Sequence, residues 1–172
     1  GDTLLAETAI EALKTKLLPL ADLITPNVPE AELLTGLKID DIDDLTKAGD
    51  ALLGMNVYAA LMKGGHLEGK SVFDVLVSEE GANIMSGPRI HSRHTHGTGC
   101  TLASAVAACM ALGAPLEEAV TAARDYVFNA IKTAPGLGEG NGPLNHGLAN
   151  GEEPAAEEKP TGNNPFAVLK DL

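Results

Sequence analysis

Short apolar runs alternate with segments of helical periodicity along most of this chain of 172 residues. The apolar runs at 21–25 and 57–62 predict buried strands. Apolar residues recur at helical spacing, or follow an opening proline, in four other segments, namely 6–18, 29–36, 43–53 and 116–133. The alternation predicts an α/β fold with a mostly parallel sheet, in which ligands bind at the carboxyl ends of the strands.

Two further strands are expected at 71–78 and 83–90, joined by the Glu79-Glu80-Gly81 turn as an antiparallel pair. Residues 1–150 then form one domain of ordinary size. Residues 151–172 are rich in Glu, Pro, Gly and Asn, and we expect them to be mostly disordered.

The net charge of −12 argues against a nucleic acid or an anionic membrane as partner. Any phosphate site must therefore depend on local backbone geometry and a few placed cations. No apolar run approaches the roughly 18 residues that span a membrane. Cys100 and Cys109 are nine residues apart near one helix, about 13 Å, which is too far for a disulfide. Two unpaired thiols are typical of the reducing cytoplasm.

Residues 94–101 read His-Thr-His-Gly-Thr-Gly-Cys-Thr and lead into an Ala-rich helix expected at 102–112. Glycine at 97 and 99 permits a tight turn, so the amides of Gly97, Thr98, Gly99 and Cys100 can converge at the head of that helix. Such an end holds phosphate or developing negative charge, and it favours the thiolate of a cysteine placed there. The alternative is a glycine-rich turn that only caps a helix beside a packed cysteine.

Gly-Thr-Gly-Cys before a helix of small residues resembles the anion-hole motif of the ribokinase-like kinases. Cysteine at its last position is characteristic of the hydroxymethylpyrimidine/phosphomethylpyrimidine kinase branch, which serves thiamin synthesis. Three more segments match this family in the same order, at 23–32, 62–66 and 142–146. The resemblance covers roughly residues 1–148. It implies a three-layer α/β/α ribokinase-like fold that lacks its N-terminal part here, because members of the family are about half as long again.

The resemblance also implies roles for individual residues. Cys100 is the base that takes the proton from the substrate hydroxyl, within an anion hole of Gly97, Thr98, Gly99 and Cys100. Asn27 and Glu30 organise Mg²⁺, partly through water, as suits a cation that prefers hard oxygen ligands. The ATP co-substrate is bound by Lys63, Gly64 and Thr95.

Each of these residues also has a simpler interpretation. Asn-x-x-Glu is a common helix-capping pattern, and Lys63 can be an exposed loop lysine. Histidines at 91, 94 and 96 allow a metal site, and His96 with Cys100 imitates a cysteine-hydrolase pair, although no third orienting residue is identifiable. Cys109 is expected only to pack.

The sequence therefore predicts a cytoplasmic kinase portion that phosphorylates the aminopyrimidine alcohol and then its monophosphate. A pyridoxal kinase of the same superfamily is the enzymatic alternative, since the residues that discriminate the substrates lie largely in the absent part. A non-catalytic nucleotide-site fragment is the alternative from another class. The expected partners are the small alcohol, ATP, and either an N-terminal half or further copies of the chain.

Overall fold

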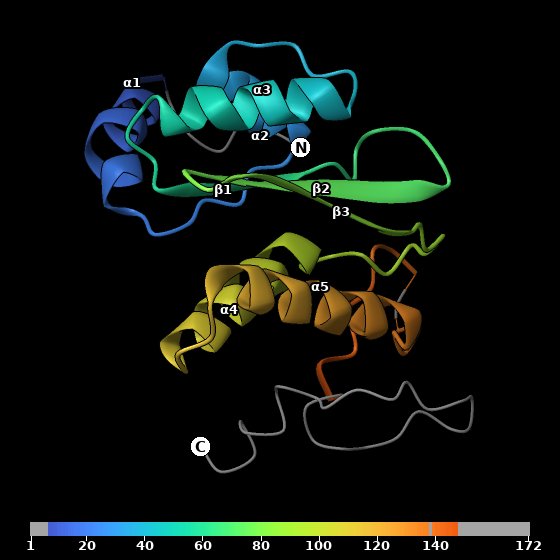
Figure 1. Ribbon diagram of the computed structural model, residues 1–172. Coiled ribbons are helices and arrows are strands. Elements are labelled where there is room, and N and C mark those ends of the chain that lie inside the picture. The colour runs from blue at the N-terminus through green and yellow to red at the C-terminus, as the bar shows by residue number, and fades with distance from the viewer. Residues whose placement is uncertain (1–6, 138, 148–172) are drawn as a thin grey trace. The chain divides into compact units, whose positions relative to one another are not determined.

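The computed structural model describes residues 7–137 and 139–147, which fall into two compact units (Figure 1). Unit 1 ends at Arg89 and contains three strands and most of the helices. Unit 2 begins at Ile90 and contains the helices α4 and α5. The acidic segment expected at 151–172 lies outside the described residues.

Unit 1 opens with α1 (Glu7–Ala12), which continues as a π-helical turn (Leu13–Leu17) and a 3₁₀ turn (Leu18–Leu20). The sequence predicted one helix over 6–18 that Pro19 would end. Instead, Pro19 lies in the first positions of the 3₁₀ turn, where its missing N–H costs no hydrogen bond. The prediction of helical structure was right, but the helix changes type before the proline.

The sheet of unit 1 contains β1 (Ala59–Lys63), β2 (Ser71–Ser78) and β3 (Gly81–Pro88), in that order and all antiparallel. This confirms the antiparallel pair, joined by a turn at Glu79 and Glu80, although β3 begins and ends two residues before the expected 83–90. The strand expected at 21–25 is present only as parallel bridges from Ile24 to Ala60 and from Asn27 to Lys63. Parallel pairing, which we expected to dominate the sheet, is thus confined in unit 1 to the outer side of β1.

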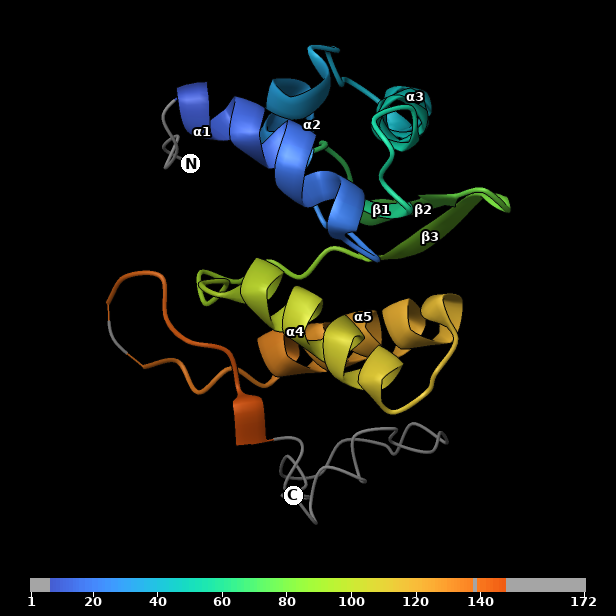
Figure 2. The same ribbon diagram turned by 90° about the vertical axis from the view of Figure 1, so that its left-hand side faces the viewer.

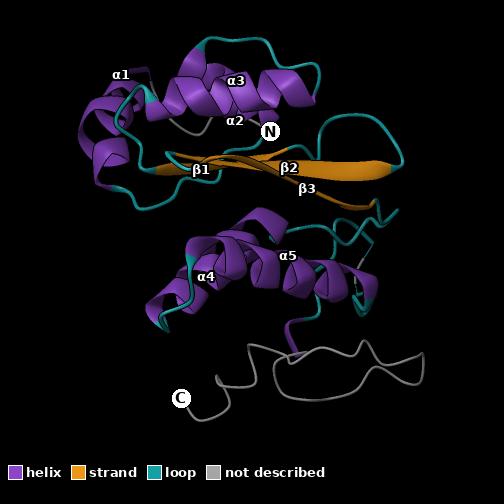
Figure 3. Cartoon of the chain, viewed as in Figure 1, coloured by secondary structure: helices purple, strands orange, loops and turns teal. Residues whose placement is uncertain are grey.

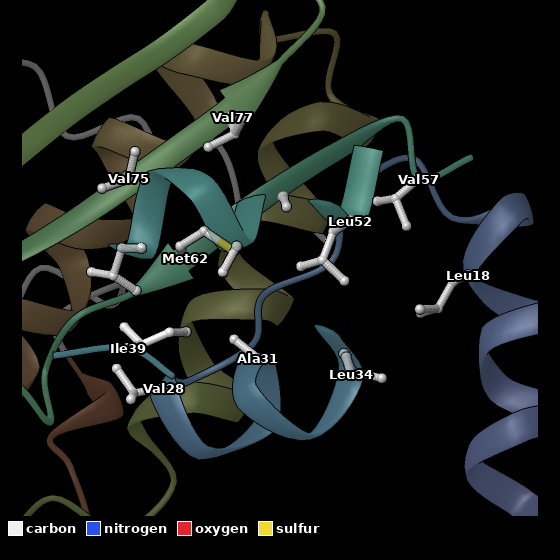
Figure 4. Close-up of a cluster of buried hydrophobic side chains, with 13 residues drawn as sticks. Leu18, Val28, Ala31, Leu34, Ile39, Leu52, Val57, Met62, Val75 and Val77 are labelled. Carbon is white, nitrogen blue, oxygen red and sulfur yellow. The ribbon is translucent and has the colours of Figure 1, made fainter. Parts of the chain in front are cut away.

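Two helices, α2 (Val28–Thr35) and α3 (Ile42–Leu53), lie over one face of this sheet (Figures 1 and 2). Figure 4 shows Ala31 and Leu34 of α2, Leu52 of α3 and Met62 of β1 within one buried cluster. Leucine, valine, alanine and methionine fill this core, as the scarcity of aromatic residues in the sequence requires. The cluster fixes α2 against β1, so the start of α2 and the end of β1 are held together.

Unit 2 is built on α4 (Thr98–Ala111) and α5 (Leu116–Lys132), which pack together as a helical hairpin (Figure 3). Gly113, with φ of +91°, makes the turn between them. α5 begins at Leu116 as predicted and ends at Lys132, one residue before the predicted end, whereas α4 begins four residues before the predicted start at 102. Gly99 and Cys100 therefore belong to the first turn of α4. No helix among the described residues is long and apolar enough to cross a membrane.

Candidate active site

Asn27 and Glu30 form a complete capping box at the start of α2. The Asn27 N–H donates to Glu30 Oε2 (2.8 Å), and the Glu30 N–H donates to Asn27 Oδ1 (2.9 Å). Asn27 also bridges Lys63 in the parallel direction, since the Lys63 N–H donates to the Pro26 carbonyl (2.9 Å). Three of the residues predicted for the site thus lie together where β1 ends.

The donor set of this corner fits a magnesium ion held partly through water. Magnesium uses one or two carboxylates and keeps several water ligands, so it needs no closed protein cage. Glu30 is exposed, and its Oε1 takes no part in the cap. The described residues hold no group of three or more His, Cys, Asp or Glu side chains able to bind a metal. Asn27 and Glu30 therefore remain predicted magnesium ligands, and the same two side chains also cap α2.

The segment after Lys63 runs directly against β2. The Gly64 N–H donates to Asp74 Oδ1 (3.0 Å), and Asp74 is only 7% exposed. A Cβ at Gly64 would overlap the carbonyl oxygen of Phe73, so this close approach requires glycine. The backbone of Lys63 is therefore paired on both sides, with Pro26 on one and with β2 on the other.

The N-terminus of α4 has no side-chain cap. Its N-cap residue is Gly97, with φ of +84°, a conformation that favours glycine. Among the described residues, no acceptor is found for the N–H groups of Gly99 and Cys100. Cys100 is exposed and unpaired at the third position of the helix. Open amides, a positive helix end and an accessible thiol are suited to an anion and to proton transfer.

Threonines brace this turn from within. The Thr98 N–H (3.3 Å) and Oγ1 (3.1 Å) both donate to the Thr95 carbonyl, and Thr101 Oγ1 donates to the Gly97 carbonyl (2.8 Å). Thr95 itself is exposed. The turn keeps its shape through its own hydrogen bonds, which leaves the second and third amides of α4 open.

The fourth matching segment, 142–146, lies beside the His-Thr-His residues. His96 and Pro143 form a parallel bridge, and a Cβ at Gly142 would overlap the His94 ring. Nδ1 of His94 is buried without a hydrogen-bond partner. Asn145 fastens the segment to α5, because its N–H donates to the Ala130 carbonyl (3.0 Å). The His-Thr-His motif and the segment 142–146, at least 46 residues apart in the sequence, therefore lie side by side in unit 2.

The two cysteines have different surroundings. Cys109 is buried, and this desolvation raises the pKa of its thiol, as suits an inert packing residue. Cys100 is exposed, and both thiols are free, as the helical spacing predicted. Only Cys100 is therefore available for chemistry.

A groove of about 810 Å³ in unit 1 is too acidic to be a phosphate site. It lies beside the start of α2 and includes His66 of the segment after β1. The charged residues that line it include five carboxylates and a single lysine, Glu32, Asp40, Asp41, Asp43, Glu68 and Lys38. None of the residues predicted to bind phosphate lines this groove.

Comparison with known proteins identifies the family. Residues 1–145 match the family model for phosphomethylpyrimidine kinase. The chain belongs to the phosphomethylpyrimidine kinase family. It is 49% identical over 152 residues to the hydroxymethylpyrimidine/phosphomethylpyrimidine kinase of Streptomyces coelicolor, covering 88% of this chain and 56% of that protein. The chain thus spans about half the length of the curated relatives it matches in this kinase family.

Solved structures confirm the ribokinase-like fold class. A Staphylococcus aureus pyridoxal kinase in complex with AMP-PCP matches with a TM-score of 0.82 and 32% identity, over 89% of this chain and 57% of that one. Phosphomethylpyrimidine kinase from Clostridium difficile matches with a TM-score of 0.65 and 40% identity, over 76% of this chain and 52% of that one. The resemblance drawn from four sequence segments is therefore confirmed.

Sequence reasoning missed two residues of this kinase-family chain. Asp74 holds Gly64 from inside β2, and Arg89 bonds to the segment after β1. A lone aspartate within an apolar strand, Val-Phe-Asp-Val-Leu, was the available signal for the first. Nothing in the local pattern marks Arg89, because the partners of its side chain are 20 or more residues away.

Proposed function

We propose that this chain supplies the anion hole and nucleotide-binding residues of an ATP- and Mg²⁺-dependent kinase. The kinase phosphorylates the hydroxymethyl group of 4-amino-5-hydroxymethyl-2-methylpyrimidine and then the resulting monophosphate, in the cytoplasm. The observation that carries the proposal is the uncapped N-terminus of α4 with the exposed Cys100 in its first turn. Relatives named as kinases of these two compounds support the substrate assignment.

The chemistry required of these residues is modest. Phosphoryl transfer depends mainly on positioning and on stabilising charge. The amides of Gly99 and Cys100 face the transferring phosphoryl group, and Cys100 removes the proton of the attacking hydroxyl. Lys63, Gly64 and Thr95 bind the nucleotide. Asn27 and Glu30 would hold Mg²⁺, which would neutralise phosphate charge.

A cysteine series in the complete kinase tests the role of Cys100. Cys100→Ser should keep the fold and lose most phosphoryl transfer, whereas Cys100→Asp supplies another base and should retain more of it. Cys109→Ser is the matched control, because that thiol is buried away from solvent. Turnover close to wild type in Cys100→Ser would show that Cys100 is not the base.

Pyridoxal phosphorylation is the second candidate. The structural match to the S. aureus pyridoxal kinase, at a TM-score of 0.82, favours it. Turnover of both alcohols by one preparation, compared as kcat/KM, decides between them. A larger value for the aminopyrimidine alcohol supports the first candidate, and a larger value for pyridoxal replaces it.

We further propose that activity requires an N-terminal portion in addition to residues 1–172. The chain covers 56% of the S. coelicolor kinase, and an incomplete sheet leaves edge groups and apolar faces exposed. The isolated chain should aggregate, self-associate or bind nucleotide only weakly. Size-exclusion chromatography with light scattering and a coupled ADP assay test this. A well-folded, fully active monomer of 172 residues contradicts it, and self-association with activity supports a homo-oligomer instead.

A further inference from the structure

Arg89 binds the segment that follows Lys63 through four hydrogen bonds to backbone carbonyls. Its Nε donates to the Gly69 carbonyl (2.8 Å), its Nη1 to the Gly65 carbonyl (2.8 Å) and its Nη2 to the Leu67 carbonyl. Its own N–H donates to the Lys70 carbonyl (3.0 Å). One residue at the end of β3 therefore spans nearly the whole loop from β1 to β2.

The geometry suits arginine and no other residue. Three carbonyls at alternate positions face three different nitrogens of the planar guanidinium, which presents five donors in a fixed fork. A lysine ammonium carries the same charge at a single point and cannot reach three separated carbonyls in this way. All three partners of the guanidinium are backbone carbonyls and none is a carboxylate, so the contact depends on shape as much as on charge.

Among the described residues, the loop is otherwise held by two hydrogen bonds near its start and by the Leu67 side chain, which packs against the buried cluster of unit 1. The Gly64 N–H donates to the buried Asp74, and the Leu67 N–H donates to the Gly64 carbonyl (3.0 Å). Residues 65, 66 and 68–70 are exposed. Glycines at 65 and 69 give this stretch little conformational preference of its own, so its shape depends on contacts with the rest of unit 1, the hydrogen bonds of Arg89 among them.

We infer that Arg89 is a positioning residue for nucleotide binding, which acts by holding the loop 64–70, next to Lys63, in its binding conformation. The inference rests on the proposed function, because it takes Lys63 and Gly64 as nucleotide-binding residues. Arg89 acts through the loop backbone and does not itself bind phosphate. Its last partner, Lys70, is the residue before β2. The hydrogen bonds of Arg89 therefore hold the loop both near its start, at Gly65, and at its end, at Lys70.

The test uses Arg89→Lys and Arg89→Ala in the kinase completed with its N-terminal portion. Two quantities are measured, namely amide hydrogen exchange at Leu67 and MgATP affinity by calorimetry. Lys16→Ala is the control, because it removes one exposed positive charge from the same unit. Both Arg89 variants should exchange faster at Leu67 and bind MgATP on the order of tenfold more weakly. The KM for the alcohol should change little, and the control should match wild type.

Three results would overturn the inference. Full MgATP affinity in Arg89→Lys would mean that charge alone suffices. Faster exchange at Leu67 with unchanged affinity would mean that the loop's shape does not matter to nucleotide binding, and the proposed function would stand. A wild-type kinase that binds no MgATP would contradict the proposed function and the inference together.

Discussion

The helices α2 and α4 begin in opposite ways. α2 satisfies its own first turn, because Asn27 and Glu30 exchange side-chain and backbone hydrogen bonds. α4 follows its N-cap residue Gly97 without any side-chain cap, and the amides of Gly99 and Cys100 have no acceptor in the described part of the chain. A helix N-terminus that its own sequence does not cap is available to a ligand, and this difference separates a structural helix end from a candidate anion site.

The largest effect is expected from the thiol at the open end. Cys100→Ser should lower kcat by about 10²–10⁴-fold, the usual contribution of a general base, without lowering the melting temperature. Single-turnover measurements locate the loss in the chemical step. A loss confined to KM would instead assign Cys100 to binding and weaken the contrast between the two helix ends.

The glycines at the two ends of α4 offer a matched pair. Gly97 and Gly113 both have positive φ, at +84° and +91°, with space for a Cβ. Alanine at either position should destabilise the protein by about 1–2 kcal/mol, because L-residues avoid this conformation. Only Gly97→Ala should also weaken nucleotide binding. Equal affinities in the two variants would show that the turn before α4 does not shape the anion site.

Asn27 variants separate capping from metal binding at α2. Asn27→Ala should cost about 1 kcal/mol of stability and should raise the Mg²⁺ requirement. Asn27→Ser restores the cap but removes the amide oxygen, so it should recover the stability and keep the raised Mg²⁺ requirement. Urea unfolding and Mg²⁺ titration of activity measure the two effects. If Asn27→Ser recovered both the stability and the wild-type Mg²⁺ requirement, Asn27 would only cap α2 and would not bind the metal.

The smallest effect concerns the other end of α2. The Lys38 ammonium, which donates to Glu32 Oε1 at 2.9 Å, and the Ile39 N–H lower the pKa of the Glu32 carboxyl from its ordinary 4.5. The stabilisation is thus present above pH 4.5 and is lost as the pH falls through the lower folded-state pKa. Lys38→Met should slightly lower the neutral-pH melting temperature and match wild type in strong acid. A difference in melting temperature that persists in strong acid would show that the ion pair of Lys38 with Glu32 is not its cause.

The sequence predicted the elements that local pattern determines. The hairpin of β2 and β3, the capping box and α5 follow from alternation, an Asn-x-x-Glu pair and a 3.6-residue period. The start of α4 was placed four residues late, because the glycines were taken as a loop that precedes the helix. Gly99 in fact lies within its first turn. The four-segment resemblance supplied the candidate residues that spacing alone left ambiguous.

Long-range contacts account for what the sequence did not predict. The hydrogen bond from Arg89 to the Gly65 carbonyl joins positions 24 residues apart, and the one from the Gly64 N–H to Asp74 joins positions ten residues apart. The contact of His94 with Gly142 joins positions still further apart. Such pairs depend on which segments become neighbours. The local pattern marks Asp74 as unusual within an apolar strand, but it does not identify Gly64 as its partner.

The most direct measurement is an NMR titration of the completed kinase with inorganic tripolyphosphate in the absence of Mg²⁺. The account predicts that the amide signals of Gly99 and Cys100 shift strongly and saturate. The amide signals of Asn27 and Glu30, whose protons are already bonded within the cap, should stay in place. Equal shifts at both helix ends, or none at Gly99 and Cys100, would contradict the claim that the open end of α4 is the anion site.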